Sequence, residues 1–218
     1  MAAFTRNGYG QVEANQLSGQ KTGQIYASLP LDKNVTVLQN GEFMYYSYAD
    51  GMVTAQPTKG AITEPYLVFN EVKLYEEPYR TTYKDFAMIR VGENYVTSKL
   101  ATEGYGDGAE TASATIATHT EYPYRMDGIA PRMIKTNIGD IMTTNMVKVG
   151  GEYAVGDILQ PVYNETSKTM VLTNINDLST EVDGEMTYGG TGGGISWQVV
   201  KVYTMPDGQP GLKLQRVQ

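Results

Sequence analysis

Cysteine is absent from this chain of 218 residues, and histidine occurs once, as His119. The lack of cysteine excludes disulfides, thiolate metal sites and a cysteine nucleophile. With a single histidine, no two histidines can bind a zinc ion together. One histidine also cannot serve as catalytic base at one site and as proton relay at another. His119 lies between two threonines without a Gly-x-Ser-x-Gly motif, so we interpret it as a solvated or capping residue. We expect no metal and no cofactor.

Long apolar runs and an excess of positive charge are missing as well. No uninterrupted apolar run exceeds four residues, whereas a transmembrane helix needs about 20. The first residues lack the apolar core of a secretory signal. We therefore expect a soluble protein without a membrane partner. The formal net charge is −7, and an acidic surface repels phosphate backbones, so direct binding to nucleic acid is not expected.

The glycine-rich stretch TYGGTGGGISW (187–197) invites comparison with phosphate-binding loops. Ile195 stands where a P-loop requires lysine, and also where the dinucleotide motif requires its last glycine. The residues that follow, SWQVVKVY, are typical of a strand rather than of the helix that both motifs open. We interpret the stretch as a side-chain-poor connection, either mobile or passed closely by another backbone.

Carboxylate pairs are the remaining candidates for catalysis. They occur at Glu76-Glu77 and at Asp183 and Glu185, in polar, turn-like contexts. A glycosidase holds such a pair at a defined separation in a cleft, which neither context indicates. We interpret both pairs as solvated surface and expect that the protein is not an enzyme.

Strand and turn signals dominate the first half of the chain after about residue 30. Asn40-Gly41 and Asp50-Gly51 favour tight turns, which predicts a three-stranded meander at 34–39, 42–48 and 52–56. The segment 65–77 favours a strand over a helix because it is rich in Val, Phe and Tyr between two prolines. A hairpin around Gly92 and a loop-rich insert at 101–128 are expected next.

Short strands separated by turns continue from Ile129 to the end. Turn signals fall at 139–140, 150–151, 156–157 and 164–168, and Pro206-Asp207-Gly208 joins the strands of a final hairpin at 197–217. In the last strand, Leu212 and Leu214 alternate with polar residues, as in a half-buried strand. The pattern predicts an all-β fold, a barrel or sandwich of short antiparallel strands and hairpins.

Residues 1–30 differ from the rest, because apolar residues appear singly among Gly, Gln, Asn and Ser. Alone, this segment cannot bury enough surface to offset its ordering entropy. It is either a flexible terminus or an extended N-terminal arm that orders on a neighbouring subunit. In the second case the candidate partner-binding anchors are Phe4, Tyr9, Leu17, Ile25 and Tyr26. Residues 31–218 would form the β-rich domain, as one module or two.

Tyrosine is abundant, with 17 residues, and Tyr45, Tyr46 and Tyr48 fall on one predicted strand. Tyrosine combines a large contact area with a polar tip. The cluster is compatible with ordinary strand composition, with a protein interface, or with a glycan-binding module in which Tyr45 and Tyr46 touch the sugar.

Three segments carry a resemblance to a known class of proteins: PYLVFNEVKLYEE, APRMIKTNIGDIMTTNMV and VVKVYTMPDGQPGLKLQRVQ. They resemble β-rich structural proteins of tailed-bacteriophage virions, in particular capsid decoration (auxiliary head) proteins. The resemblance implies a non-enzymatic protein, made in the bacterial host cytoplasm, that binds and reinforces the assembled shell. Its implied partners are the major capsid protein and copies of itself. No functional residue can be transferred from the family.

The negative charge favours the outer capsid surface, because an acidic protein is poorly suited to an inner surface that faces DNA. Two alternatives stay open. The chain would be another virion part, such as a collar, tail or fibre base, or a glycan-binding β-module.

Overall fold

The structure, a computed structural model, describes residues 3–6, 9–57, 64–70, 88–90, 130–164, 169–182, 185–188, 194–206 and 208–218; for 88–90, 179–182 and 185–188 it describes the backbone alone. Several sequence predictions lie outside these residues: the hairpin around Gly92 beyond Arg90, the insert at 101–128, His119, and the pair Glu76-Glu77.

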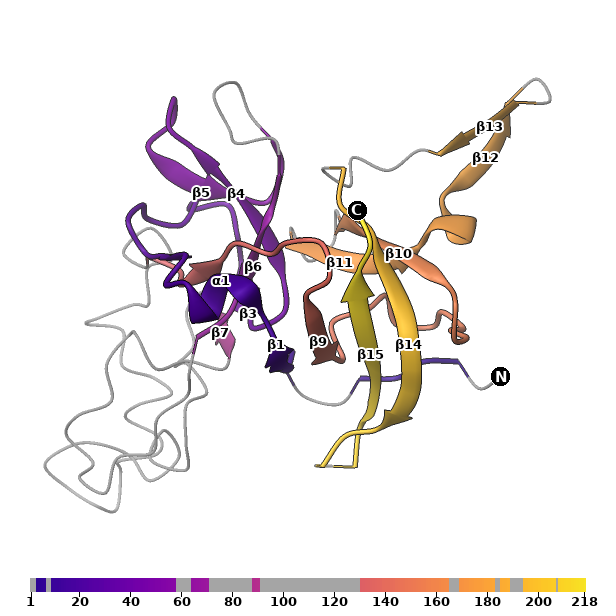
Figure 1. Cartoon of the computed structure of the whole chain (residues 1–218). Coiled ribbons are helices and arrows are strands. Elements are labelled where there is room, and N and C mark those ends of the chain that lie inside the picture. Colours follow the sequence, from indigo (N-terminus) through magenta and orange to yellow (C-terminus); the bar gives the residue numbers. More distant parts are fainter. Residues whose placement is uncertain are drawn as a thin grey trace, which may run out of the picture.

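The regular secondary structure of the described chain is almost entirely β-strand (Figure 1). Its two short helical pieces are α1 (Ser18–Lys21) and the 3-10 turn η4 (Ile175–Asp177). The strands are, in chain order, β1 (Val12–Gln16), β2 (Ile25–Tyr26), β3 (Val37–Gln39), β4 (Phe43–Ser47), β5 (Met52–Thr54), β6 (Tyr66–Val68), β7 (Met88–Arg90), β8 (Met133–Ile134), β9 (Ile141–Thr144), β10 (Ile158–Asn164), β11 (Thr169–Asn174), β12 (Ser179–Val182), β13 (Glu185–Tyr188), β14 (Trp197–Thr204) and β15 (Pro210–Arg216).

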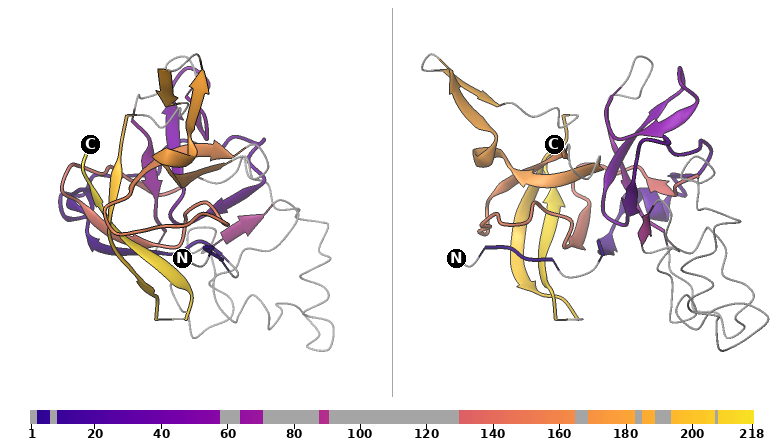
Figure 2. Two further views of the ribbon diagram at one scale, coloured as in Figure 1. Left: turned by 90° about the vertical axis from the view of Figure 1, so that its right-hand side faces the viewer. Right: turned by 180° about the vertical axis from the view of Figure 1, so that it is seen from behind.

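Within the described residues, most strands join one curled antiparallel sheet. Its order is β1-β9-β15-β14-β10-β11-β4-β6-β8-β2, with β5 paired to β4. The ladders β3–β7 and β12–β13 are separate, and β12–β13 projects from the body of the molecule (Figures 1 and 2). The prediction of an all-β fold of short antiparallel strands is confirmed, and the sheet curls like part of a barrel.

The central strand β4 is buried on both faces, which fits the apolar run FMYY with which it begins. Successive side chains of a strand point to opposite faces. Phe43 and Tyr45 accordingly join one core cluster, with Trp197 among its members. Met44 and Tyr46 join a second cluster on the other face. The sheet thus carries a core on each side of β4.

The predicted meander of three strands is correct for β4 and β5 but wrong for β3. Gly41 has the positive φ of +91° that the turn signal implied, yet β3 pairs with β7 instead of β4. Phe43 of β4 already pairs with Met170 on one edge and with Leu67 on the other. A strand has only two hydrogen-bonding edges, so β4 has none left for β3 at this end.

The predictions for 65–77 and for the final hairpin agree with the structure, whereas the predicted turn at 164–168 lies largely outside the described residues. The segment at 65–77 contains β6 in its described part. The last hairpin is formed by β14 and β15, with a bulge between Val199 and Lys201. Leu212 and Leu214 are fully buried, as the alternation indicated. Neither helical piece of the described chain has the length and apolar character needed to cross a membrane.

Candidate functional site

The N-terminal segment lies against its own chain. The backbone N–H of Phe4 donates to the Gly151 carbonyl at 2.8 Å, and the N–H of Gly150 donates to the Phe4 carbonyl at 2.8 Å. The Phe4 ring is buried and packs edge-to-face on Tyr153, with ring centroids 5.7 Å apart. The Tyr153 hydroxyl donates to the Lys148 carbonyl, so both sides of this contact are fixed by hydrogen bonds.

The rest of the segment is part of the sheet. Strand β1 pairs with β9, and β2 pairs with β8. Leu17 is buried in the same core as Phe4, and Ile25 packs against that core. At Gly19 a Cβ atom would lie 2.1 Å from the Lys135 carbonyl oxygen, so α1 approaches the chain after β8 more closely than a side chain permits.

These contacts correct the prediction of an extended arm. The apolar residues of 1–30 show no local period because their partners are strands more than 100 residues away in sequence. Phe4 and Leu17 fill the protein's own core, and Tyr9 is half-buried, with its carbonyl accepting from Asn145. Tyr26 is the exposed member of the five predicted anchors, at 39%. Binding of these residues to a neighbouring subunit stays a prediction.

A buried carboxyl group lies where the N-terminal segment meets the sheet. Glu42 has no exposed surface, and its Oε1 accepts from Gln39 Nε2 at 3.4 Å. The side-chain oxygen of Gln39 in turn accepts from the Gly10 N–H at 2.7 Å. Glu42 Oε2 has no hydrogen-bond partner in the described chain. Burial raises the Glu42 pKa to about 8, against the opposing effects of the Arg6 charge and of hydrogen bonds from Gln39 and Thr169.

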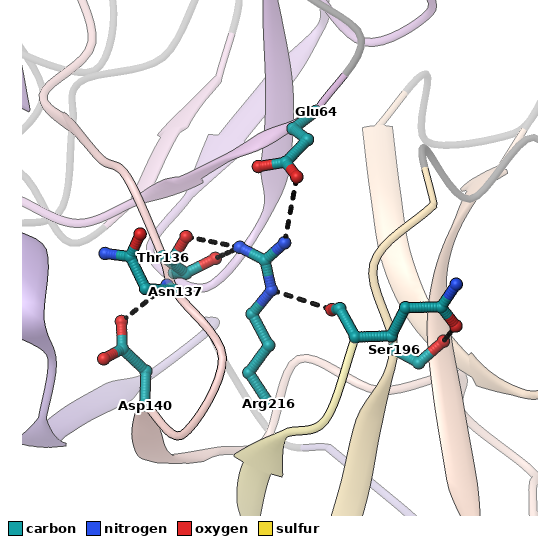
Figure 3. A network of polar contacts seen from close by, with 7 residues as sticks. Glu64, Thr136, Asn137, Asp140, Ser196 and Arg216 are labelled. Carbon is teal, nitrogen blue, oxygen red and sulfur yellow. Dashed lines mark hydrogen bonds and ion pairs between the residues drawn. The ribbon is translucent and has the colours of Figure 1, made fainter.

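A second buried polar group connects the C-terminal strand to two distant segments (Figure 3). The Arg216 guanidinium donates from Nη1 to the Thr136 carbonyl and to its hydroxyl at 3.0 Å, from Nη2 to Glu64 at 3.3 Å, and from Nε to the Gln218 carbonyl at 2.8 Å. Nearby, Asp140 accepts from the Asn137 N–H at 2.9 Å. The network holds β15 to the β8–β9 connection and to the chain before β6.

Four tyrosines form a ring cluster that reaches the surface. The Tyr46 ring is buried and contacts Tyr26 and Tyr66 edge-on, at 6.0 and 5.3 Å between centroids. Tyr48 stacks on Tyr46 at 6.1 Å with an interplanar angle of 12°, and is 65% exposed. Desolvation raises the pKa of both Tyr46 and Tyr66. The accessible part of this cluster is therefore Tyr48 with the edge of Tyr26.

The structure separates the tyrosines that the sequence grouped together. Tyr45 and Tyr46 are both buried, on opposite faces of β4, so neither offers a ring to a sugar or to another protein. Tyr48 follows the end of β4 and does offer one. The expectation that Tyr45 and Tyr46 would touch a glycan is therefore wrong, and burial on both faces of the strand is the reason.

Sequence reasoning missed both buried ionisable groups, Glu42 and Arg216. Glu42 follows a turn signal and therefore suggests a solvated position. Arg216 carried a usable signal, because the alternation of Leu212 and Leu214 continues to residue 216 on the buried face. Side chains in the described residues form no group of three His, Asp or Glu that could hold a metal ion.

Among the described residues, the tyrosine surface around Tyr48 is accessible, and the polar groups of the interior connect distant segments. Comparison of the chain with protein-family models, with curated proteins and with solved structures found no match.

Proposed function

We propose that this protein is a non-enzymatic structural component of a tailed-bacteriophage particle. It binds the outside of the assembled capsid shell and bridges or reinforces the major capsid subunits, with contacts to copies of itself. The proposal starts from the resemblance of three segments to capsid decoration proteins, and from the net charge of −7.

The observation that carries the proposal is the position of those three segments in the fold. The segment 130–147 contains β8 and β9, the segment 199–218 contains β15, and the described part of 65–77 contains β6. These strands are hydrogen-bonded neighbours in two pairs, β9 with β15 and β6 with β8. The three segments are far apart in sequence but form parts of one sheet. This supports the view that the resemblance reflects one connected part of the fold.

The Arg216 network supports the same interpretation. It connects the second and third segments directly, through the hydrogen bonds from Arg216 to Thr136. Its contact with Glu64 reaches the residue just before the first segment. A buried arginine with four such bonds holds the three segments in one fixed arrangement, as a rigid reinforcing part requires.

The test uses phage particles assembled with and without the gene for this chain. Purified full-length protein is added to shells that lack it, and binding is measured by co-sedimentation. We expect saturable binding to the shells, and breakage of the undecorated shells at a lower temperature than decorated ones. Absence of the chain from complete particles, or no co-sedimentation with undecorated shells, would refute the proposal.

A pair of surface variants tests which face contacts the shell. Tyr26→Ala alters the exposed member of the predicted anchors, and Ile138→Ala alters an exposed apolar residue in a turn. We expect Tyr26→Ala to weaken co-sedimentation while Ile138→Ala leaves it unchanged. Deletion of residues 1–30 is a poorer test, because it also removes Phe4 and Leu17 from the core.

The exposed Tyr48 ring favours glycan binding as a second candidate function. Tyr48 stacks on Tyr46 and is 65% exposed, so its ring is available to pack against the apolar face of a sugar ring. Binding on a glycan array that is lost in Tyr48→Ala and kept in Val149→Ala would support this candidate. An array without signal for the parent protein would dismiss it.

A further inference from the structure

Strand β14 is paired on both edges in its first part only. Trp197 and Gln198 pair with Leu159 and Ile158 of β10. Val199 extends this contact, since its N–H donates to the Asp157 carbonyl and its carbonyl accepts from the Gly156 N–H, both at 2.8 Å. Beyond Val199 the pairing to β10 ends, while pairing to β15 continues to Thr204. The end of the β14–β15 hairpin is the lowest coloured part of Figure 1.

The hydrogen-bond directions along β15 show which residues of β14 face outward. Arg216 exchanges its backbone bonds with Gly139 and Asp140, on the β9 side. Directions alternate along an antiparallel strand, so Lys213 and Gly211 face β14. Their partners in β14 are Lys201 and Tyr203.

The N–H and C=O groups of Val202 and Thr204 therefore point away from β15. The described residues provide no backbone partner on that side. This is an open strand edge, and such an edge can pair with another strand.

The side chains beside this edge are exposed. Val200 and Val202 are 43% and 44% exposed, and Lys201 and Thr204 are exposed as well. The Lys201 amine lies 5.7 Å from the centre of the Tyr203 ring, and the Tyr203 hydroxyl donates to Glu13 at 3.1 Å. One face of the edge thus presents a cation, an aromatic ring and a carboxylate close together.

We propose that this edge binds the same edge of a second copy of the chain. The two β14 strands run antiparallel about a two-fold axis at Val202, which lies opposite Val202 of the second copy. The two Val202 residues exchange both backbone bonds, and Thr204 pairs with Val200 of the second copy. The inference concerns the chain in solution and does not depend on a place in a virion.

Charge complementarity selects a second copy as the occupant. In this register Lys201 lies opposite Tyr203 of the second copy, whose hydroxyl contacts Glu13. Each copy therefore places its cation beside the ring and carboxylate of the other, and no like charges lie directly opposite each other. The net charge of −7 on each copy opposes dimer formation, because the two copies repel each other, and salt screens this repulsion. Dimer formation should accordingly strengthen as salt is added.

The absence of cysteine from the chain makes a direct test possible. Directly opposite residues of a hydrogen-bonded antiparallel pair have Cα atoms about 5.5 Å apart. That separation is within the range of a disulfide, about 4.4 to 6.8 Å. Under mild oxidation, Val202→Cys should become a disulfide-linked dimer of twice the 23.9 kDa chain mass. Val149→Cys, at a comparably exposed valine in a turn, is the control and should stay monomeric.

A second pair of variants tests the backbone bonds without cysteine. Val202→Pro removes an outward-facing N–H and leaves the β14–β15 bonds in place, so we expect a folded monomer by sedimentation. The parent and Val149→Lys should show the same concentration-dependent dimer. Should Val202→Pro not fold, Val202→Lys, which places two like charges at the axis, replaces it with the same expected loss.

Any of three results would overturn the proposal. One is a parent protein that sediments as a monomer at all concentrations, with Val202→Cys cross-linking no faster than Val149→Cys. Another is a monomeric parent whose binding to shells is lost in Val202→Lys, which would assign the edge to the major capsid protein. Dimer formation that survives Val202→Lys would also contradict it, because the interface would then lie elsewhere.

Discussion

Replacement of Glu42 by glutamine tests the buried junction between the N-terminal segment and the sheet. The unfolded carboxyl has a pKa of 4.5, and burial raises it to about 8 in the folded protein. At a pH between these two pKa values, Glu42 keeps its proton in the folded state and has lost it in the unfolded state. The contribution of Glu42 to stability is therefore fully present below pH 4.5 and is lost as the pH rises to about 8.

The size of the effect follows from the two pKa values. The difference between 4.5 and about 8, at about 1.4 kcal/mol per unit, corresponds to about 5 kcal/mol. Because relaxation of the surrounding protein reduces the cost of burying a charge, a loss of about 2 to 5 kcal/mol is expected over the range. The Glu42→Gln side chain keeps the shape and stays neutral, so the variant should be more stable than the parent at pH 8 and similar to it near pH 4.

Urea unfolding at a series of pH values measures this difference, followed by the fluorescence of the single tryptophan, Trp197, which is fully buried. Subtracting the curve of Glu42→Gln from that of the parent cancels the other titrating groups. Asp50→Asn, at an exposed position after β4, is the control and, introduced into both proteins, should leave the difference between the pH curves of the parent and Glu42→Gln unchanged. Parallel curves for the parent and Glu42→Gln from pH 4 to 8 would refute the reasoning.

Three further substitutions test the other contacts. Phe4→Ala should lower the free energy of unfolding by about 3 kcal/mol through lost core burial, whereas Thr5→Ala, at an exposed neighbour, should change it by less than about 0.5 kcal/mol. Equal urea midpoints for the two would show that the segment is not held on the core. Gly10→Ala should cost about 1 to 3 kcal/mol, because its Cβ would lie 2.3 Å from Met146 Sδ and 2.5 Å from the Asn40 carbonyl oxygen. Faster proteolysis near the N-terminus is the measurement, and unchanged cleavage would contradict the contact. Arg216→Met should cost about 3 to 5 kcal/mol in thermal or urea unfolding, because it leaves the buried Thr136 carbonyl unpaired. Glu64→Gln removes only the half-exposed partner and should cost less than about 1 kcal/mol, so similar losses for the two would argue against this view of the network.

Local patterns were sufficient for much of the β-structure. The alternation of Leu212 and Leu214 identified the buried face of β15, and the turn signal at Asp50-Gly51 identified the β4–β5 hairpin. Both depend on neighbours within a few residues, which the sequence displays directly. The same reasoning rejected a phosphate loop at 187–197, and the described part of that stretch runs into β14.

Sequence patterns failed where the partner of a residue lies far along the chain. The turn at Gly41 is present, but β4 pairs with β6 and β11, which left β3 to pair with β7. Tyr45 and Tyr46 were grouped together as surface candidates, although the strand places them in separate cores. Competition for strand edges and burial on two faces are decided only when all strands are in position.

The sequence by itself determined that this protein is built of short antiparallel strands, because strand alternation and turn chemistry act over a few residues. Tertiary structure decided that the N-terminal segment is part of the sheet, since Phe4 and Leu17 find their contacts only when distant strands come together. It also decided where ionisable groups are buried, at Glu42 and Arg216, and where β14 leaves an edge open. These properties depend on which strands become neighbours, and no local pattern encodes that.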